Sequence, residues 1–250
     1  MLTCVRHIEE TTSMKRIIRA VVMALLLVPG ILWANDLTQQ FSAGVDAYKA
    51  GEYETAYEIW LPMAENGHAY AQTLLGSLYQ NGEGVVQDYV EAARWYRLAA
   101  EQGIAGAQSN LGIMYHQGQG VLQDYAEAAR WYRLAAEQGV AEAQFNLGFG
   151  YYQGIGVIQD YEEAVRWYRL AAEQGNARAQ LNLGLMYTLG NGVIQDYSTA
   201  HMWFNIAARN GDSDAVNMRD AIAEELPPEA IAAAQSRARI CIESDSQDCD

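Results

Sequence analysis

The chain has 250 residues, half of them hydrophobic, and its 31 acidic and 16 basic residues give a formal net charge of −15. Because no basic patch is present to neutralise phosphates, we expect neither nucleic acid nor an anionic membrane surface as a partner. Both signs of charge recur along the chain, so the excess of acid is not that of an acidic tail.

The first segment has the order of a secretory signal peptide. Residues 14–19 are short and basic, residues 20–33 are apolar apart from one Pro-Gly pair, and Ala34 offers a small residue for cleavage. The apolar stretch is too short and too poorly flanked for a membrane span. We predict that residues 1–34 are a signal peptide, with Met14 as an alternative start. The mature protein would be periplasmic or envelope-associated and free of the membrane.

Residues 35–70 follow as a predicted helix pair. Ala47, Tyr48, Ala56, Trp60 and Ala64 place small and aromatic residues as in the longer units downstream. The segment lacks the Gly-x-Gly turn of those units, which makes it shorter.

Residues 71–214 are four copies of one 36-residue block without insertions. The copies span residues 71–106, 107–142, 143–178 and 179–214. A fixed period in this range predicts a solenoid, in which each unit buries its apolar face only against its neighbours. Such a chain presents a surface and rarely builds a single reactive pocket.

The first half of each block predicts a helix. In the second copy, Ala107, Leu111 and Tyr115 lie four residues apart on one helix face. Gly112 lies beside that face and recurs in all four copies, although glycine costs ~1 kcal/mol in helix propensity. Its presence indicates the close approach of a neighbouring helix. Gly118 then ends the helix, because glycine tolerates left-handed geometry.

A second helix begins after Asp124, whose carboxylate can accept hydrogen bonds from the first turn. Glu127, three residues on, would complete a variant of the capping box. One tryptophan recurs in this helix and is predicted to be a core wedge between helix pairs. The equivalent tryptophans are Trp95, Trp131, Trp167 and Trp203. The chain is therefore predicted to be all-α, an α/α superhelical solenoid of stacked antiparallel helix pairs.

The pattern A-x-x-x-L-G-x-x-Y-x-x-G-x-G-V-x-x-D-Y-x-x-A-x-x-W-x-x-x-A-A-x-x-G covers residues 71–211. It resembles the Sel-1-like repeat, a relative of the tetratricopeptide repeat, and residues 35–70 resemble a shorter tetratricopeptide unit. The resemblance implies a stacked α/α scaffold that binds other proteins, and several bacterial members of the family work in the cell envelope. Cysteine-rich members carry a cysteine pair in each repeat; no repeat here contains cysteine, so their association with cell-wall ligands is not carried over.

Residues 215–250 are predicted to be C-terminal capping helices and a tail. Residues 215–225 look like one more first helix, and Pro228 suits the first turn of a final helix that runs to about Ile242 and covers the last apolar face. Cys241 and Cys249 are either joined by a disulfide, as an oxidising compartment would allow, or left as two unpaired thiols.

The sequence offers little for catalysis. The histidines are scattered without metal-ligand spacing, at His7, His68, His116 and His201. The Gly-x-Gly pairs recur as turns and lack the Lys-Ser/Thr of a phosphate loop, and no nucleophile elbow is present. We expect no enzymatic activity, no metal and no cofactor.

Partner binding is expected where the copies differ. In tetratricopeptide relatives the first helices line a concave groove, so the variable residues of these helices are the candidates. They are Asn110, His116, Phe145, Asn146, Phe149, Tyr152 and Asn182. The three asparagines could hydrogen-bond a peptide backbone or bridge adjacent repeats. Gly150 replaces Leu or Met among aromatic residues, which either opens an anchor pocket or is filled by those rings.

We therefore predict an exported, non-catalytic scaffold for protein–protein contacts in the periplasm or envelope, whose groove receives a partner's extended peptide or helix. The alternative is a module that binds an envelope polymer, peptidoglycan or exopolysaccharide, through exposed tyrosine and tryptophan faces. Burial of all four repeat tryptophans would count against this alternative.

Overall fold

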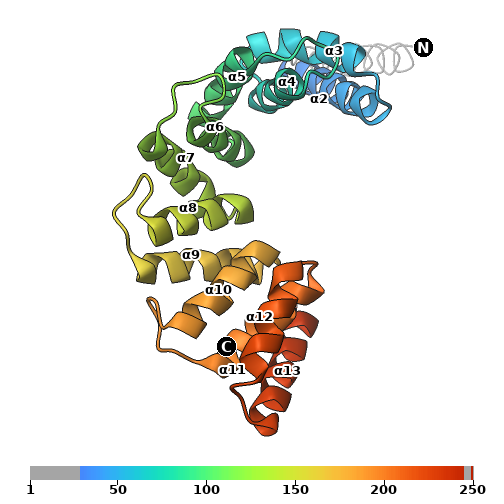
Figure 1. Cartoon of the computed structure of the whole chain (residues 1–250). Coiled ribbons are helices and arrows are strands. Elements are labelled where there is room, and N and C mark those ends of the chain that lie inside the picture. The colour runs from blue at the N-terminus through green and yellow to red at the C-terminus, as the bar shows by residue number, and fades with distance from the viewer. Residues whose placement is uncertain (1–28, 245–248, 250) are drawn as a thin grey trace, which may run out of the picture.

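The computed structural model describes residues 29–244 and 249, and within them the chain folds as twelve consecutive helices without a strand. The helices follow an arc, with α2, α4 and α6 on its inner side (Figure 1). The N-terminal pair is α2 (Pro29–Lys49) and α3 (Tyr53–Glu65). Residues 1–28 of the predicted signal peptide lie outside the described residues, and its predicted end falls within α2.

Four helix pairs form the body of the arc. They are α4 (Ala69–Asn81) with α5 (Tyr89–Glu101), α6 (Ala105–Gln117) with α7 (Tyr125–Glu137), α8 (Ala141–Gln153) with α9 (Tyr161–Glu173), and α10 (Ala177–Leu189) with α11 (Tyr197–Arg209). Two further helices, α12 (Ser213–Ala223) and α13 (Pro228–Glu243), close its C-terminal end. The predicted solenoid of stacked helix pairs is confirmed. No helix among the described residues combines the length and apolar character of a membrane span.

The second helix of each of the four pairs in the body of the arc begins with an aspartate cap, as predicted. The carboxylate of Asp124 accepts hydrogen bonds from the backbone N–H groups of Ala126 at 2.9 Å and Glu127 at 3.0 Å. The reciprocal half of the capping box does not form, because the N–H of Asp124 already donates to the carbonyl of Tyr115 at 3.0 Å. Glu127 instead accepts a hydrogen bond from Arg130 Nε at 3.0 Å.

The core consists of aromatic wedges between small residues. The four repeat tryptophans are 1–5% exposed. A Cβ added to Gly112 would lie 2.7 Å from the ring of Tyr132, so only glycine lets α6 and α7 approach this closely. The close approach that the sequence predicted is therefore made by the second helix of the same repeat.

A buried glutamine at the start of each repeat donates a hydrogen bond to a backbone carbonyl of the preceding unit. Gln144 is 4% exposed and donates to the carbonyl of Ala136 at 3.1 Å. The bond to Ala136 reaches the preceding repeat, and Oε1 of Gln144 accepts a hydrogen bond at 2.7 Å from Gln174 Nε2, at the end of the second helix of its own repeat. The equivalent pairs are Gln102 to Gln72, Gln138 to Gln108 and Asn210 to Gln180.

Helix α13 covers the outer face of α11. Ala234, Ala238 and Cys241 are buried there, in one cluster with Met202 and Trp203. In the earlier repeats this face of the second helix carries a solvated Glu–Arg ion pair, and the last repeat has Thr and Met in those two places. The final helix thus packs on a face of α11 that lacks the ion pair of the earlier repeats. Its end is held by a disulfide between Cys241 and Cys249, whose Cα atoms are 4.5 Å apart.

Candidate functional site

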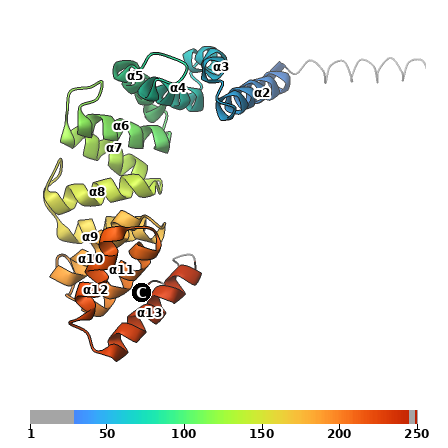
Figure 2. The same cartoon turned by 45° about the vertical axis from the view of Figure 1, so that its right-hand side comes forward.

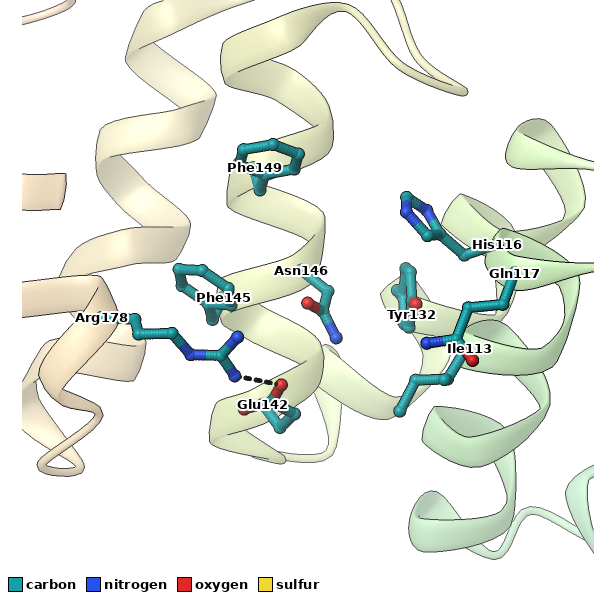
Figure 3. Close-up of a pocket in the computed structure, with 9 residues that line it drawn as sticks. All are labelled: Ile113, His116, Gln117, Tyr132, Glu142, Phe145, Asn146, Phe149 and Arg178. Atoms are coloured by element: carbon teal, nitrogen blue, oxygen red, sulfur yellow. Dashed lines mark hydrogen bonds and ion pairs between the residues drawn. The ribbon is translucent and has the colours of Figure 1, made fainter. Parts of the chain in front are cut away.

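A hollow of about 380 Å³ opens between α6 and α8, and α6 lies on the inner side of the arc (Figure 1). We call it the central hollow. It is lined by Ile113, His116, Gln117, Tyr132, Glu142, Phe145, Asn146, Phe149 and Arg178. Figure 3 shows residues of α8 facing residues of α6 across the space, with Arg178 reaching in from the start of α10.

Helical spacing places the lining residues. Phe145 and Phe149 are four residues apart, so they lie one turn above the other on α8, and Asn146 projects from the same helix towards α6 (Figure 3). Ile113 and His116, three residues apart on α6, form the opposite wall. The hollow therefore offers two phenyl rings with an amide on one side, and an imidazole with an aliphatic side chain on the other.

An ion pair between repeats fixes one end of the central hollow. Arg178 donates to Glu142 at 2.5 Å, and its guanidinium lies 4.5 Å from the centre of the Phe145 ring. The two charged side chains are 58% and 42% exposed, so the pair adds at most ~1 kcal/mol to stability. Its main effect is on orientation, because Arg178 is held across Phe145 by two contacts.

The base of the hollow is Tyr132, from α7. Burial raises the pKa of its hydroxyl, and the charge of Glu142 raises it further. The group therefore stays protonated at neutral pH and can donate a hydrogen bond. Together with the amide of Asn146 and the imidazole of His116, it gives the hollow both donors and acceptors.

Of the seven predicted site residues, the structure brings four together in the central hollow. These are His116, Phe145, Asn146 and Phe149. The other three lie outside its lining. The Tyr152 ring packs on Tyr161 with centroids 5.7 Å apart, Asn182 is half-buried on α10, and Asn110 interacts with the hydroxyl of Tyr96 in the preceding repeat.

Gly150 does not line the central hollow. An added Cβ there would lie 3.1 Å from the carbonyl oxygen of Ile155, so the loop backbone closes much of the space left by the missing side chain. What remains is a recess of about 10 Å³ lined by Phe149, Gly150 and Ile155 among others, about the room that one water molecule needs. Gly150 thus lines this recess and not the central hollow.

Five lining residues are not among the seven predicted site residues; they are Ile113, Gln117, Tyr132, Glu142 and Arg178. A signal for two of them was present. Glu142 and Arg178 occupy the same position in consecutive repeats and carry opposite charges. Tyr132 gave no signal, because its equivalents are aromatic in every copy and indicate only core.

A second, smaller hollow lies between α10 and α12. We call it the C-terminal hollow, of about 210 Å³; it is lined by Leu185, Thr188, Tyr197, Phe204, Met218, Ala221, Ile222 and Glu225. Five of its eight lining residues are the equivalents, two repeats on, of residues that line the central hollow, with Thr188 for His116 and Met218 for Asn146. The same inter-repeat position is thus polar in one hollow and largely apolar in the other.

The fold defines the class of this molecule as an α/α solenoid. A family model described as the Sel1 repeat matches residues 69–104, 105–140, 141–176 and 177–212, more than half of the sequence, and the chain belongs to the Sel1 repeat family. Each matched segment begins at the first residue of α4, α6, α8 or α10. A Sel1 repeat scaffold supports a role in protein interaction.

Two solved structures are similar to this chain. One is a protective antigen present in uropathogenic Escherichia coli strains, displaying an SLR fold, with 41% identity, a TM-score of 0.69, and coverage of 72% of this chain and 39% of that one. The other is a Sel1 repeat protein from Oxalobacter formigenes, with 37% identity, a TM-score of 0.67, and coverage of 72% and 73%.

One curated relative is also similar, an "Exopolysaccharide production negative regulator" of Rhizobium leguminosarum bv. viciae. The two sequences are 41% identical over 56 residues, which are 22% of this chain and 21% of the relative. The chain thus spans about a fifth of that protein.

Proposed function

We propose that this protein is an exported, non-catalytic scaffold that holds an extended segment of a partner protein along the inner face of its arc. The central hollow carries the proposal. It combines aromatic walls with donors and acceptors on the inner face of a stacked-repeat fold, and such folds use their extended concave surfaces for binding.

The lining suits one side chain and the adjoining backbone of a peptide. An apolar side chain can pack between Phe145 and Phe149, where it leaves water. Asn146 carries both a donor and an acceptor, so it can pair with a peptide group in either direction. Because Arg178 is already held by Glu142, little side-chain ordering remains to oppose binding.

The C-terminal hollow supplies a second anchor on the same face. It lies at the equivalent position between repeats, two repeats further along, so an extended segment that follows the arc can reach both hollows. Its apolar lining accepts a second hydrophobic side chain. Two anchors on one segment raise affinity without a large interface, because the second contact forms within the complex.

Export is supported by two features. Residues 14–34 have the order of a signal peptide, and a Cys241–Cys249 disulfide is typical of proteins from oxidising compartments. The test is N-terminal sequencing of the protein from periplasmic extracts. We expect a mature chain that begins at Asn35, and recovery of an uncleaved chain from the cytosol would contradict export.

Binding can be tested with a phage-displayed library of random 16-residue peptides, selected on the purified protein. Peptides with two hydrophobic anchors are expected. Phe149→Ala should weaken their binding at least tenfold while leaving the melting temperature nearly unchanged, because Phe149 is only partly buried. Tyr152→Ala is the matched control, since Tyr152 lies on the same helix outside the central hollow. Equal loss in both variants would argue against the hollow as the site.

The alternative is an envelope-polymer module, and the name of the Rhizobium relative refers to exopolysaccharide production. Stacking on a sugar needs an exposed indole face, whereas all four repeat tryptophans are 1–5% exposed. Retention on purified cell-wall sacculi, together with failure of the peptide selection, would favour this alternative.

A further inference from the structure

A row of aliphatic side chains projects into solvent from the loops that join the helices within each repeat. Val86, Leu122, Ile158 and Ile194 are 88%, 89%, 91% and 90% exposed, and each occupies the same position of its repeat. We call them the edge row. The α6–α7, α8–α9 and α10–α11 loops follow one another along one side of the molecule, and the view in Figure 2 agrees with that in Figure 1.

These loops are fixed, so the exposure is part of the fold. The residue before each member packs inward; Val121, for example, packs on the cluster around Leu111. The residue after each member is a glutamine whose side chain donates back to the preceding helix, as Gln123 does to the carbonyl of His116 at 2.8 Å. The four side chains are thus held outward by anchored neighbours on both sides.

Comparison of the four copies indicates that the aliphatic character of the edge row is not accidental. The middle residue of the Gly-x-Gly turn is Glu83, Gln119, Ile155 and Asn191 in the four copies. The position after the helix-starting tyrosine holds Val90, Ala126, Glu162 and Ser198. Each of these two positions is polar in some copies and apolar in others. The edge-row position holds valine, leucine or isoleucine and is therefore aliphatic in all four copies. Single exposed hydrophobic residues need no explanation, but four aligned ones point to a binding surface.

The acidic residues around the edge row indicate which kind of partner can bind there. Residues 82–90, 118–126, 154–162 and 190–198 contain two, one, two and one acidic residues, six in all, and no Lys or Arg. A second copy of this chain would bring like charges together, and the anionic surface of a bacterial membrane would be repelled. A partner with basic residues beside its apolar stripe is complementary.

We propose that the edge row is a docking surface for a cationic amphipathic helix of a partner protein, separate from the inner face. Packed helices lie about 8–10 Å apart, and two turns of helix advance about 11 Å. A helix laid along the edge can therefore bring an aliphatic side chain to neighbouring repeats while its lysines and arginines meet the acidic flanks.

The test uses two fluorescein-labelled 18-residue helical peptides, one of Leu and Lys and one of Leu and Glu, with binding to the full chain followed by fluorescence anisotropy at low salt. The edge variant is Val86→Ser, Leu122→Ser, Ile158→Ser and Ile194→Ser. The control variant replaces exposed apolar residues elsewhere, Tyr70→Ser and Ile240→Ser, which are 61% and 51% exposed. All three proteins should melt at the same temperature, since the changes are at exposed positions.

We expect the wild type and the control variant to bind the Leu/Lys peptide equally, the edge variant to bind it at least tenfold more weakly, and none to bind the Leu/Glu peptide. Absence of binding by the wild type, or equal binding by the edge variant, overturns the proposal. Two further outcomes would also overturn it. If the wild type dimerises in sedimentation velocity and the edge variant does not, the edge row binds a second copy of the chain. If the wild type co-sediments with phosphatidylglycerol vesicles and the edge variant does not, the edge row binds a lipid surface. Phe149→Ala should leave peptide binding at the edge unchanged, which separates this result from the inner-face site.

Discussion

The buried glutamines that connect the repeats should contribute more to stability than any surface ion pair of this protein. Gln144→Ala removes two hydrogen bonds, to the carbonyl of Ala136 and from Gln174, at ~1 kcal/mol each. It also removes one buried methylene group, at Cγ, at ~0.8 kcal/mol. The expected loss is about 3 kcal/mol. Gln174→Ala removes one of these hydrogen bonds from an exposed side chain and should cost about 1 kcal/mol.

The assay is urea unfolding of the two variants and the wild type, followed both by tryptophan fluorescence and by far-ultraviolet circular dichroism. Coincident transitions and equal slopes allow the free energies of unfolding to be compared directly. The reasoning is refuted if Gln174→Ala costs as much as Gln144→Ala. It is also refuted if both stay within ~0.5 kcal/mol of the wild type, since the connection between repeats would then be carried by apolar packing alone.

Three further predictions concern the helix pairs. Trp131→Ala should cost about 3–5 kcal/mol in thermal unfolding, while Leu122→Ala, at an 89% exposed position, should stay within ~0.5 kcal/mol of wild type. Asp124→Ala should lower stability by about 0.5–2 kcal/mol, and Asp124→Asn should restore most of it, because asparagine also caps helices. Burial alone would raise the pKa of Asp196, but hydrogen bonds, first of all from Thr199, outweigh it and the pKa is lowered. A lowered carboxyl pKa gives stability that is lost as pH falls through the folded value, so melting of Asp196→Asn should depend less on pH below about 4 than melting of the wild type.

Most of the fold follows from local signals in the repeated block. Asp124 and Gly118 mark the start of one helix and the end of another by chemistry that operates within a few residues. The start of the first helix is less clearly marked: the repeated block is counted from Ala71, whereas α4 begins at Ala69. The reason is that its N-cap has diverged. His68 accepts a hydrogen bond through its side chain, whereas Ile104, at the same position of the next repeat, makes no side-chain cap, so no common residue marks the boundary.

The site was predicted less completely, because it forms between repeats. Phe145 and Phe149 could be found on one helix as departures from the repeated pattern. Arg178 joins them only because stacking brings the next helix pair close, so that its guanidinium lies 4.5 Å from the centre of the Phe145 ring. The block contains no information on how far one repeat is rotated against the next, and that rotation decides which side chains share a hollow.

In a chain made of near-identical copies, differences between the copies carry more information on function than the shared residues do. Positions that stay identical, such as the capping aspartates, are explained by the helix pair itself. On the inner face, by contrast, equivalent positions differ between copies: Asn146 lines one hollow and Met218 the other. This is expected if each repeat contacts a different part of one partner. The edge row is a third case, with varied residues of one constant chemistry. Such a surface requires only hydrophobic contact at regular intervals, so it fits a partner with apolar side chains at regular spacing, such as an amphipathic helix.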